Sequence, residues 1–357
     1  MALSIGIVGL PNVGKSTLFN ALTDGEALAA NYPFATIEPN TGVVPIPDRR
    51  LAKLAELYKT DKIIPASVQF VDIAGLVAGA HQGEGLGNQF LAHIRSTAAI
   101  CHVVRAFADP NVTAAGSSSP AKDIEIIGAE LALADLQTVD KRLPQLAKEA
   151  RADLKLKPQL ASLTEVKTLL AAGKPLSEIN PDHIADLFLL SAKPVIYVFN
   201  VDEAGLKGRT LKLKGTTLRE VVAPAEALFI CAKLESELRG LDAAERAELL
   251  ASYSQTSSGL EQLVQAAYGA LGLQSFLTAG EKEVRAWTIA AGTTAPAAAG
   301  VIHSDFEKGF IAAQVVDYDD LIQVGSLAAA RAAGKVQTCG RDYQLQPNDV
   351  VEFRFNI

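Results

Sequence analysis

The stretch Leu3-Ser4-Ile5-Gly6-Ile7-Val8, followed at once by Gly9-Leu10-Pro11-Asn12-Val13-Gly14-Lys15-Ser16, decides the fold of this chain. The short apolar run predicts a buried strand, and Leu18, Phe19 and Leu22 have the spacing of a helix. The turn between them has the pattern Gly-x-x-x-x-Gly-Lys-Ser, whose backbone N–H groups and helix N-terminus face a phosphate. The sequence therefore predicts a strand, a phosphate-binding loop and a helix.

Further apolar runs resemble the first strand. They cover residues 68–73, 100–104 and 195–199, and the first and last of them lead into polar motifs. Buried parallel strands end in this way where they deliver residues to a site. We therefore expect the α/β class, with an open sheet and the ligand at the carboxyl ends of its strands.

Two regions depart from this alternation. Residues 124–190 are rich in Ala, Leu, Glu and Lys, which favours an inserted helical hairpin. Its turn is expected at residues 155–158, because proline disfavours helix in the residue before it. From residue 274 onward, alternating segments such as 284–289 and 350–355 are separated by helical stretches, and they predict a small α+β domain.

Composition limits the classes of function. The 357 residues carry a formal net charge of −7, which provides no overall field for nucleic acid and predicts no DNA partner. No apolar run approaches the roughly 18 residues of a membrane span, and no leader pattern is expected. Cys101, Cys231 and Cys339 are odd in number and far apart, as reduced thiols are. We expect a cytoplasmic protein with no membrane partner.

The phosphate-binding pattern assigns roles to several residues. Lys15 is expected to reach the β- and γ-phosphates, and the Ser16 hydroxyl to bind Mg²⁺. In Asp72-Ile73-Ala74-Gly75, Asp72 is expected to hold Mg²⁺ directly or through a water, while the Gly75 amide senses the γ-phosphate. Thr36 lies in a segment without clear periodicity between these motifs and is the third expected Mg²⁺ ligand.

The sequence does not identify the residue that orients the attacking water. Many GTPases place a glutamine directly after the glycine of this motif, but Leu76 stands there and cannot position water. His81, Gln82 and Glu84 follow in a glycine-rich stretch, and nothing in the pattern singles out one of them. Intrinsic hydrolysis is therefore expected to be slow.

The base motif favours adenine. Guanine-specific P-loop proteins usually carry Asn-Lys-x-Asp, whereas this chain has Asn200-Val201-Asp202-Glu203. Glu203 is one methylene too long to replace the aspartate, and Val201 lacks the lysine stem that packs on the base. Adenine suits the Asn200 side-chain oxygen or a nearby carbonyl, and an unmatched buried pair costs about 1–3 kcal/mol. The segment Ile230-Cys231-Ala232-Lys233 is expected to lie beneath the base.

With these motifs in order, the sequence resembles the YchF or Obg-like ATPase family over essentially its whole length. The most specific matches are Gly9-Leu10-Pro11-Asn12-Val13-Gly14-Lys15-Ser16-Thr17-Leu18-Phe19-Asn20, Thr36-Ile37-Glu38-Pro39-Asn40, Gly83-Glu84-Gly85-Leu86-Gly87-Asn88-Gln89-Phe90, Asn200-x-x-Glu203 and His303-Ser304-Asp305-Phe306-Glu307-Lys308-Gly309-Phe310. The resemblance implies a P-loop NTPase G domain at residues 1–272, interrupted by a coiled-coil arm at 124–190. It also implies a ubiquitin-like TGS domain at 274–356, a preference for ATP and the ribosome as partner.

The resemblance also implies site residues. By carry-over, Asn12, Val13, Gly14, Lys15, Ser16 and Thr17 form the ATP phosphate site, Ser16 and Thr36 bind Mg²⁺, and Asn200, Val201 and Glu203 lie on the adenine side. One departure matters: some members have a histidine, suspected of helping hydrolysis, where this chain has Asp109-Pro110-Asn111-Val112-Thr113-Ala114-Ala115-Gly116. Because Asn12 resembles the asparagine with which some glutamine-less P-loop enzymes hold K⁺, a K⁺ ion is a further expected cofactor.

Two other functions remain open. The shared P-loop and Asp-x-x-Gly layout also suits a GTP-specific translation GTPase. Leu76 and the basic residues within 141–157 also suit an RNA- or ribosome-binding module whose nucleotide is mainly structural. Those basic residues are either a solvated helical face or a contact with RNA phosphates.

Overall fold

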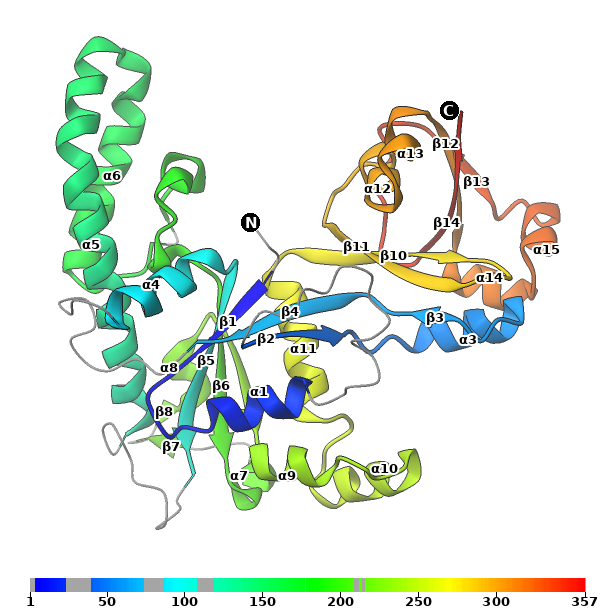
Figure 1. Ribbon diagram of the computed structural model, residues 1–357, viewed down its shortest axis with the longest axis horizontal. Coiled ribbons are helices and arrows are strands. Elements are labelled where there is room, and N and C mark those ends of the chain that lie inside the picture. The colour runs from blue at the N-terminus through cyan, green and yellow to red at the C-terminus, as the bar shows by residue number, and fades with distance from the viewer. Residues whose placement is uncertain are drawn as a thin grey trace. The chain divides into compact units, whose positions relative to one another are not determined.

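The computed structural model describes residues 4–23, 40–73, 86–107, 119–176, 178–208, 212–213 and 216–356, with side-chain surroundings given from residue 89 in α4 (Figure 1). The chain divides into two compact units, one of Met1–Gly42 with Gln69–Leu263 and one of Val43–Val68 with Val264–Ile357. No described helix is both long enough and apolar enough to cross a membrane.

The first unit is built on a six-stranded sheet with the order β2-β4-β1-β5-β6-β9. Its central strand β1 is buried along its whole length, which explains its unbroken apolar sequence. Four neighbouring pairs, from β4 to β9, are parallel, so their carboxyl ends lie on one edge. The strands are β1 (Ser4–Val8), β2 (Thr41–Pro45), β4 (Ser67–Asp72), β5 (Ala99–Ala106), β6 (Val195–Val201) and β9 (Glu226–Ile230).

Short helices accompany this sheet. They are α1 (Lys15–Thr23), α4 (Leu86–Ser96), α7 (Glu203–Gly208), α8 (Leu218–Val222), α9 (Ala232–Glu237), α10 (Ala243–Ser252) and α11 (Gly259–Ala270), with a small ribbon of β7 (Lys212–Leu213) and β8 (Thr216–Thr217). Thr217 and Asp242 each form a capping box that starts α8 and α10. The expected α/β fold of a P-loop G domain is confirmed.

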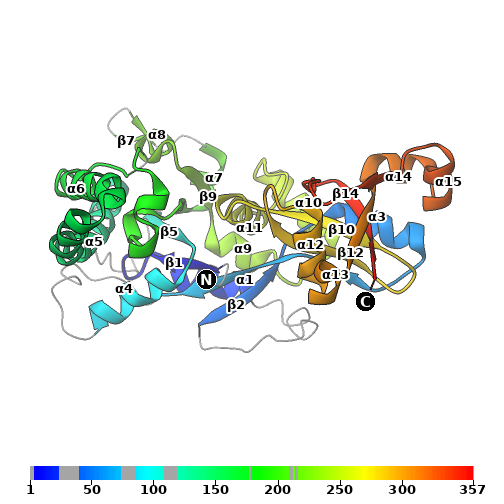
Figure 2. The ribbon, with the colours of Figure 1, turned by 90° about the horizontal axis from the view of Figure 1, so that it is seen from above.

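The expected helical hairpin is confirmed as an arm of two antiparallel helices that lie side by side in both views (Figures 1 and 2). Helix α5 (Pro120–Ala152) turns through η2 (Leu154–Leu156) into α6 (Lys157–Ala171). Val139, Leu146, Leu163 and Val166 form its buried seam. Three short turns return the chain to the sheet: η3 (Pro181–His183), η4 (Ala185–Leu187) and η5 (Leu190–Ala192).

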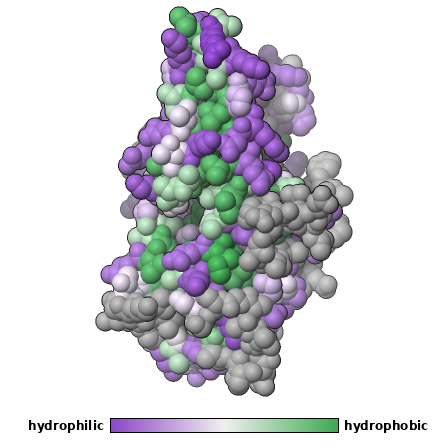
Figure 3. All heavy atoms as spheres, turned by 90° about the vertical axis from the view of Figure 1, so that its left-hand side faces the viewer, coloured by the Kyte–Doolittle hydropathy of each residue, from purple (hydrophilic) through white to green (hydrophobic). Residues whose placement is uncertain are grey.

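The outer surface of the arm is mixed. Figure 3 shows a column of hydrophobic residues along this side of the arm, with hydrophilic residues beside it. Leu133 and Leu154 are exposed apolar residues of α5 and η2. Of the basic residues, Arg142 pairs with Glu149 at 2.9 Å, whereas Lys141, Lys148, Arg151, Lys155 and Lys157 are exposed.

The second unit contains a sheet with the order β13-β12-β14-β10-β11-β3. Strands β10 and β14 are parallel at its centre, and β10–β11 and β12–β14 are antiparallel, which is the ubiquitin-like arrangement. Its elements are β3 (Ile63–Ile64), β10 (Leu273–Ala279), β11 (Val284–Ala290), β12 (Phe310–Asp317), β13 (Gln337–Cys339), β14 (Asp349–Phe355), α3 (Arg49–Tyr58), α12 (Ala295–Ile302), α13 (Ser304–Lys308), α14 (Tyr318–Val324) and α15 (Leu327–Ala332).

Residues 43–68 belong to this second unit, although they stand early in the chain. Leu51 and Leu54 of α3 are buried in one core with Leu277. Arg50 donates to Asn348 Oδ1 at 3.1 Å and to the carbonyl of Pro347. The expected boundary between 272 and 274 takes no account of this segment, and the domain assignment remains a proposal.

The motif from His303 to Phe310 has a structural explanation. His303 Nδ1 accepts a hydrogen bond from the Asp305 N–H at 3.2 Å and so starts α13. A Cβ on Gly309 would lie 2.0 Å from the carbonyl oxygen of Asn356, so no larger residue fits there. The motif therefore helps to close the second unit.

Candidate nucleotide site

The phosphate-binding loop has the geometry that its sequence predicts. It joins β1 to α1, and Lys15 is the first residue of that helix. Lys15 is buried, and its Nζ donates to the Leu10 carbonyl at 2.8 Å across the loop. Burial lowers the pKa of Lys15, and the Asp72 carboxylate partly opposes this effect. The ammonium is thus held in a desolvated position where an anion would be its natural partner.

Ser16 in the first turn of α1 and Asp72 at the end of β4 are brought together, although they lie far apart in the sequence. Ser16 Oγ donates to Asp72 Oδ2 at 3.2 Å, while Asp72 Oδ1 is buried and has no hydrogen-bond partner among the described residues. A buried carboxylate oxygen without a partner is costly unless a cation or water satisfies it. Together with a hydroxyl, it is the oxygen-rich donor set that Mg²⁺ prefers. These two residues therefore fit the ion.

Asn200 ties the phosphate loop to the loop that follows β9. Its Nδ2 donates to the Val13 carbonyl at 2.9 Å, and its Oδ1 accepts from the Ala232 N–H at 3.2 Å. Gly14 has φ +96°, and a Cβ there would lie 2.3 Å from Asn200 Nδ2, so glycine is required for this approach. The Asn200 oxygen is already engaged with the backbone, which argues against our expectation that it reads adenine.

A pocket of about 880 Å³ opens beside these residues. Its lining includes most of the expected nucleotide-binding residues: Asn12, Gly14, Thr17, Asn200, Val201, Glu203 and Cys231. It also includes Phe107, which the sequence analysis missed and which follows the last residue of β5. The only sequence signal for Phe107 was an aromatic residue directly after a strand that leads to the site. Phe107 gives the pocket an apolar surface suited to the face of a planar base, whereas Val201 is almost wholly buried in the core beside the pocket.

Glu203 does not stand free in this pocket. Lys233 Nζ lies 2.9 Å from Glu203 Oε1, and the Tyr253 hydroxyl donates to Oε2 at 3.2 Å. The hydrogen bond from Lys233 lowers the pKa of Glu203. Both carboxylate oxygens are thus paired within the protein. Lys233 was expected only in the loop beneath the base, and Tyr253 had been assigned no role from the sequence.

Several expected site residues lie outside the described residues. They are the Mg²⁺ ligand Thr36, the γ-phosphate sensor Gly75, Leu76, the loop residues His81, Gln82 and Glu84, and the histidine-free segment 109–116. Their roles stay predictions. The described residues contain no group of three or more His, Cys, Asp or Glu side chains able to hold a metal. Of the expected Mg²⁺ ligands, the structure describes Ser16 and Asp72.

Comparisons with known proteins match both units. A family model described as "50S ribosome-binding GTPase" matches residues 4–141, and the model YchF-GTPase_C, described as a protein of unknown function, matches residues 273–356. The chain is 48% identical to the "Ribosome-binding ATPase YchF" of Bacillus subtilis over 366 aligned residues, covering 100% of each chain. The chain belongs to the YchF and Obg-like ATPase family.

Other YchF relatives agree in sequence and structure. Rat "Obg-like ATPase 1" is 44% identical, covering 99% of this chain and 93% of its own. The structure of the Schizosaccharomyces pombe YchF GTPase superimposes with a TM-score of 0.86 at 37% identity and covers 99% of this chain and 97% of its own. A GTP-binding protein of Pyrococcus horikoshii, at 20% identity and a TM-score of 0.60, shows the shared fold alone.

Proposed function

We propose that this protein hydrolyses ATP in preference to GTP, with Mg²⁺, and acts as a slow nucleotide-dependent switch on the ribosome. The observation that carries the base preference is the pairing of Glu203 with Lys233 and Tyr253. A guanine would need a carboxylate aimed at its N1–H and N2–H₂ donors, whereas the bonds from Lys233 and Tyr253 hold the longer Glu203 side chain toward the protein and compete with the base for its oxygens. Adenine places no donor at those positions, so the paired carboxylate costs it nothing.

The phosphate groups are held by the loop and its lysine. Lys15 would leave the Leu10 carbonyl for the β- and γ-phosphates, where its charge stabilises the developing negative charge of the transition state. Bound Mg²⁺ would supply charge neutralisation of the phosphates, held by Ser16 and Thr36 and by Asp72 through a water or directly. The Gly75 amide would sense the γ-phosphate. Leu76 stands where many GTPases place the water-orienting glutamine, and slow turnover is part of the proposal for this reason.

K⁺ is a second proposed cofactor. Asn12 lines the pocket and has a left-handed backbone with φ 61°. An ion bound there would add positive charge where other enzymes use a side chain. The test compares hydrolysis in KCl and NaCl at equal ionic strength, and equal rates would exclude this role.

The ribosome is proposed as the partner because curated relatives are named for binding it. The exposed basic residues of the arm suit contact with RNA phosphates, and a cytoplasmic location follows from such a partner. The alternative of a module with a merely structural nucleotide predicts equal ribosome association in ATP and ADP. Our proposal predicts at least a fivefold difference when ribosomes are pelleted with the purified protein in each nucleotide.

The arm can be tested in the same assay. A triple variant reverses three exposed charges of the arm: Lys148→Glu, Arg151→Glu and Lys155→Glu. It is expected to pellet less with ribosomes, and its ribosome binding is expected to depend less on salt. The variant's affinity for ATP serves as the control and is expected to be unchanged, because none of these residues lines the nucleotide pocket. Full co-pelleting by a folded variant would contradict an arm contact.

A further inference from the structure

Strand β9 is the last strand of the first sheet, so one of its edges has no neighbouring strand in that sheet. The Ala227 carbonyl faces this open side, where Arg219 Nη2 donates to it at 3.2 Å. Main-chain groups of alternate residues face the same side of a strand, so the N–H and C=O of Phe229 also face outward. Among the described strands, β9 pairs only with β6. Such an edge is a template for one more strand.

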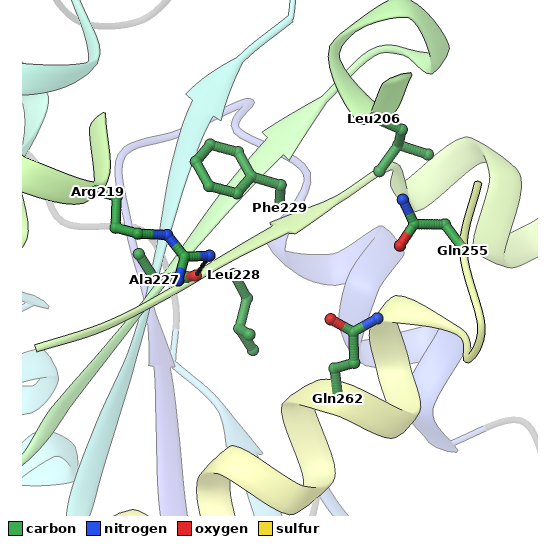
Figure 4. A pocket seen from close by; sticks show the side chains of 7 residues that line it. All are labelled: Leu206, Arg219, Ala227, Leu228, Phe229, Gln255 and Gln262. Atoms are coloured by element: carbon green, nitrogen blue, oxygen red, sulfur yellow. Dashed lines mark hydrogen bonds between the residues drawn. The ribbon is translucent and has the colours of Figure 1, made fainter. Parts of the chain in front are cut away.

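The open edge of β9 is the floor of a pocket of about 420 Å³ (Figure 4). In this view Phe229 points to one face of the sheet and Leu228 to the other, so the reader looks at the edge itself. Leu206 of α7 lies on the Phe229 side, and Gln262 of α11 lies on the Leu228 side. An added strand forms hydrogen bonds with the main chain of the edge and packs against apolar side chains on both faces of the sheet.

Three polar side chains surround this floor. Arg219 of α8 stands at the Ala227 end, and Gln255 and Gln262 stand opposite it (Figure 4). Arg219 is exposed, and its one hydrogen bond to the Ala227 carbonyl leaves further N–H donors of the guanidinium available. The two carboxamides can each donate and accept, as an extended backbone requires. The edge, the walls and the polar groups share no residue with the nucleotide pocket.

We propose that the β9 edge binds an extended segment of a partner protein as an added strand, with a carboxylate side chain of that segment opposite Arg219. The Ala227 N–H and the main chain of Phe229 provide the ladder, since the Ala227 carbonyl already accepts from Arg219. Leu206 and Phe229 contact the apolar side chains of the segment, and Arg219 selects the acidic residue. Gln255 and Gln262 bond the segment's free peptide groups.

A second copy of this chain is the less suitable occupant. In an edge-to-edge dimer two β9 strands would have to meet, but each lies at the floor of a pocket between α7, α8 and α11. A single extended segment can enter such a recess, whereas the walls of two recesses would collide.

The site lies close to the base pocket along the chain. Phe229 stacks on Phe199 with ring centroids 5.3 Å apart, and Phe199 precedes Asn200 on β6. Gln255 lies two residues after Tyr253, the partner of Glu203. A bound segment would therefore touch the elements that carry the base pocket, but its binding does not require the proposed nucleotide preference to be right.

The test uses the full chain and two pools of octapeptides that are N-acetylated and C-amidated. In each peptide, valines alternate with randomised residues. One pool carries a fixed glutamate and the other a fixed lysine. Retention on the immobilised protein is expected for the glutamate pool, and fluorescence anisotropy then measures the recovered peptides. Amide hydrogen exchange at Ala227 and Phe229 is expected to slow at least fivefold on binding.

Charge reversal makes the assignment specific. Arg219→Glu is expected to lower the affinity for the glutamate peptides at least tenfold, and the immobilised variant is expected to retain the lysine pool instead. Arg151→Glu, the same change on the exposed end of α5, is expected to change neither. If Arg219→Glu fails to fold, Gln262→Ala replaces it, with an expected loss of at least threefold. The proposal would be overturned if the folded variants bound the glutamate peptides as the wild type does, or if neither peptide pool were retained. It would also be overturned if amide exchange slowed only outside Ala227 and Phe229, or if the wild type formed a dimer that Arg219→Glu lost.

Discussion

Lys233 holds the carboxylate of Glu203 at 2.9 Å. This ion pair lies at the mouth of the proposed base pocket and fixes a side chain that is one methylene longer than the aspartate of guanine-specific relatives. Glu203 and Lys233 are both substantially exposed, so the pair is not a source of stability for the fold. The pair matters for recognition, because an incoming guanine has to compete with Lys233 and Tyr253 for the Glu203 carboxylate.

Rebuilding the guanine motif is expected to reverse the base preference. In the double variant Val201→Lys with Glu203→Asp, the shorter carboxylate no longer reaches Lys233, and the new lysine stem packs on the base. The ratio of GTP to ATP affinity is expected to rise at least tenfold, which corresponds to about 1.4 kcal/mol. Competition against a fluorescent nucleotide measures it. Val201→Leu is the control, and an unchanged ratio in the folded double variant would contradict this account of the base pocket.

Asn200→Ala is expected to loosen the phosphate loop. Asn200 is buried, and its side chain makes hydrogen bonds with the Val13 carbonyl and the Ala232 N–H. The substitution would leave these two backbone groups without a partner. The expected loss in the free energy of unfolding is about 1–3 kcal/mol, with weaker binding of ATP and GTP alike. Urea titration measures the first effect. Asn180→Ala, which removes an exposed asparagine that also accepts from a backbone N–H, is expected to cost less.

Asp72→Asn is expected to weaken Mg²⁺ and leave the loop intact. The amide keeps the shape of the side chain and an oxygen for the Ser16 hydroxyl, but it removes the charge from the buried, unpartnered Oδ1 position. The Mg²⁺ concentration needed for half-maximal nucleotide binding is expected to rise about 10–100-fold. Binding measured in EDTA is the control and is expected to persist. An unchanged Mg²⁺ requirement would remove Asp72 from the ion's surroundings.

His102 is expected to make the protein sensitive to acid. Burial in β5, and secondarily the charge of Lys15, lower its pKa from 6.5 to about 3. The unfolded chain therefore binds more protons than the folded one between these values, so the free energy of unfolding falls as the pH is lowered from 6.5 toward 3. His102→Gln is expected to flatten that part of the pH profile. The exposed His93→Gln is the control, and parallel profiles for His102→Gln and the wild type would disprove the buried neutral imidazole.

The sequence predicted the parts of the molecule that repeat a local pattern. The apolar run before Gly9, the glycine-rich loop and Lys15 are neighbours in the chain, so their strand, loop and helix could be inferred directly. The arm was also visible, because residues 124–190 are rich in Ala, Leu, Glu and Lys, although α6 ends at Ala171 and only short turns follow it. Asp72 could be placed at the end of a strand for the same reason.

The remainder depends on contacts between distant residues. Lys233 and Tyr253 lie 30 and 50 residues from Glu203, so no local pattern reveals that they pair with it. Asn200 was expected to face the base, but the backbone groups of Val13 and Ala232 take its side chain. The packing of α3 with the second unit was missed for the same reason, because the partners of Arg50 lie almost 300 residues away.

The central claim is the preference for ATP, and equilibrium titration of the purified full chain with ATP and GTP in Mg²⁺ tests it most directly. The structure has both Glu203 oxygens paired, so we predict that ATP binds at least tenfold more tightly than GTP. GTP binding tenfold more tightly than ATP would contradict the account and would assign the protein to the GTP-specific alternative.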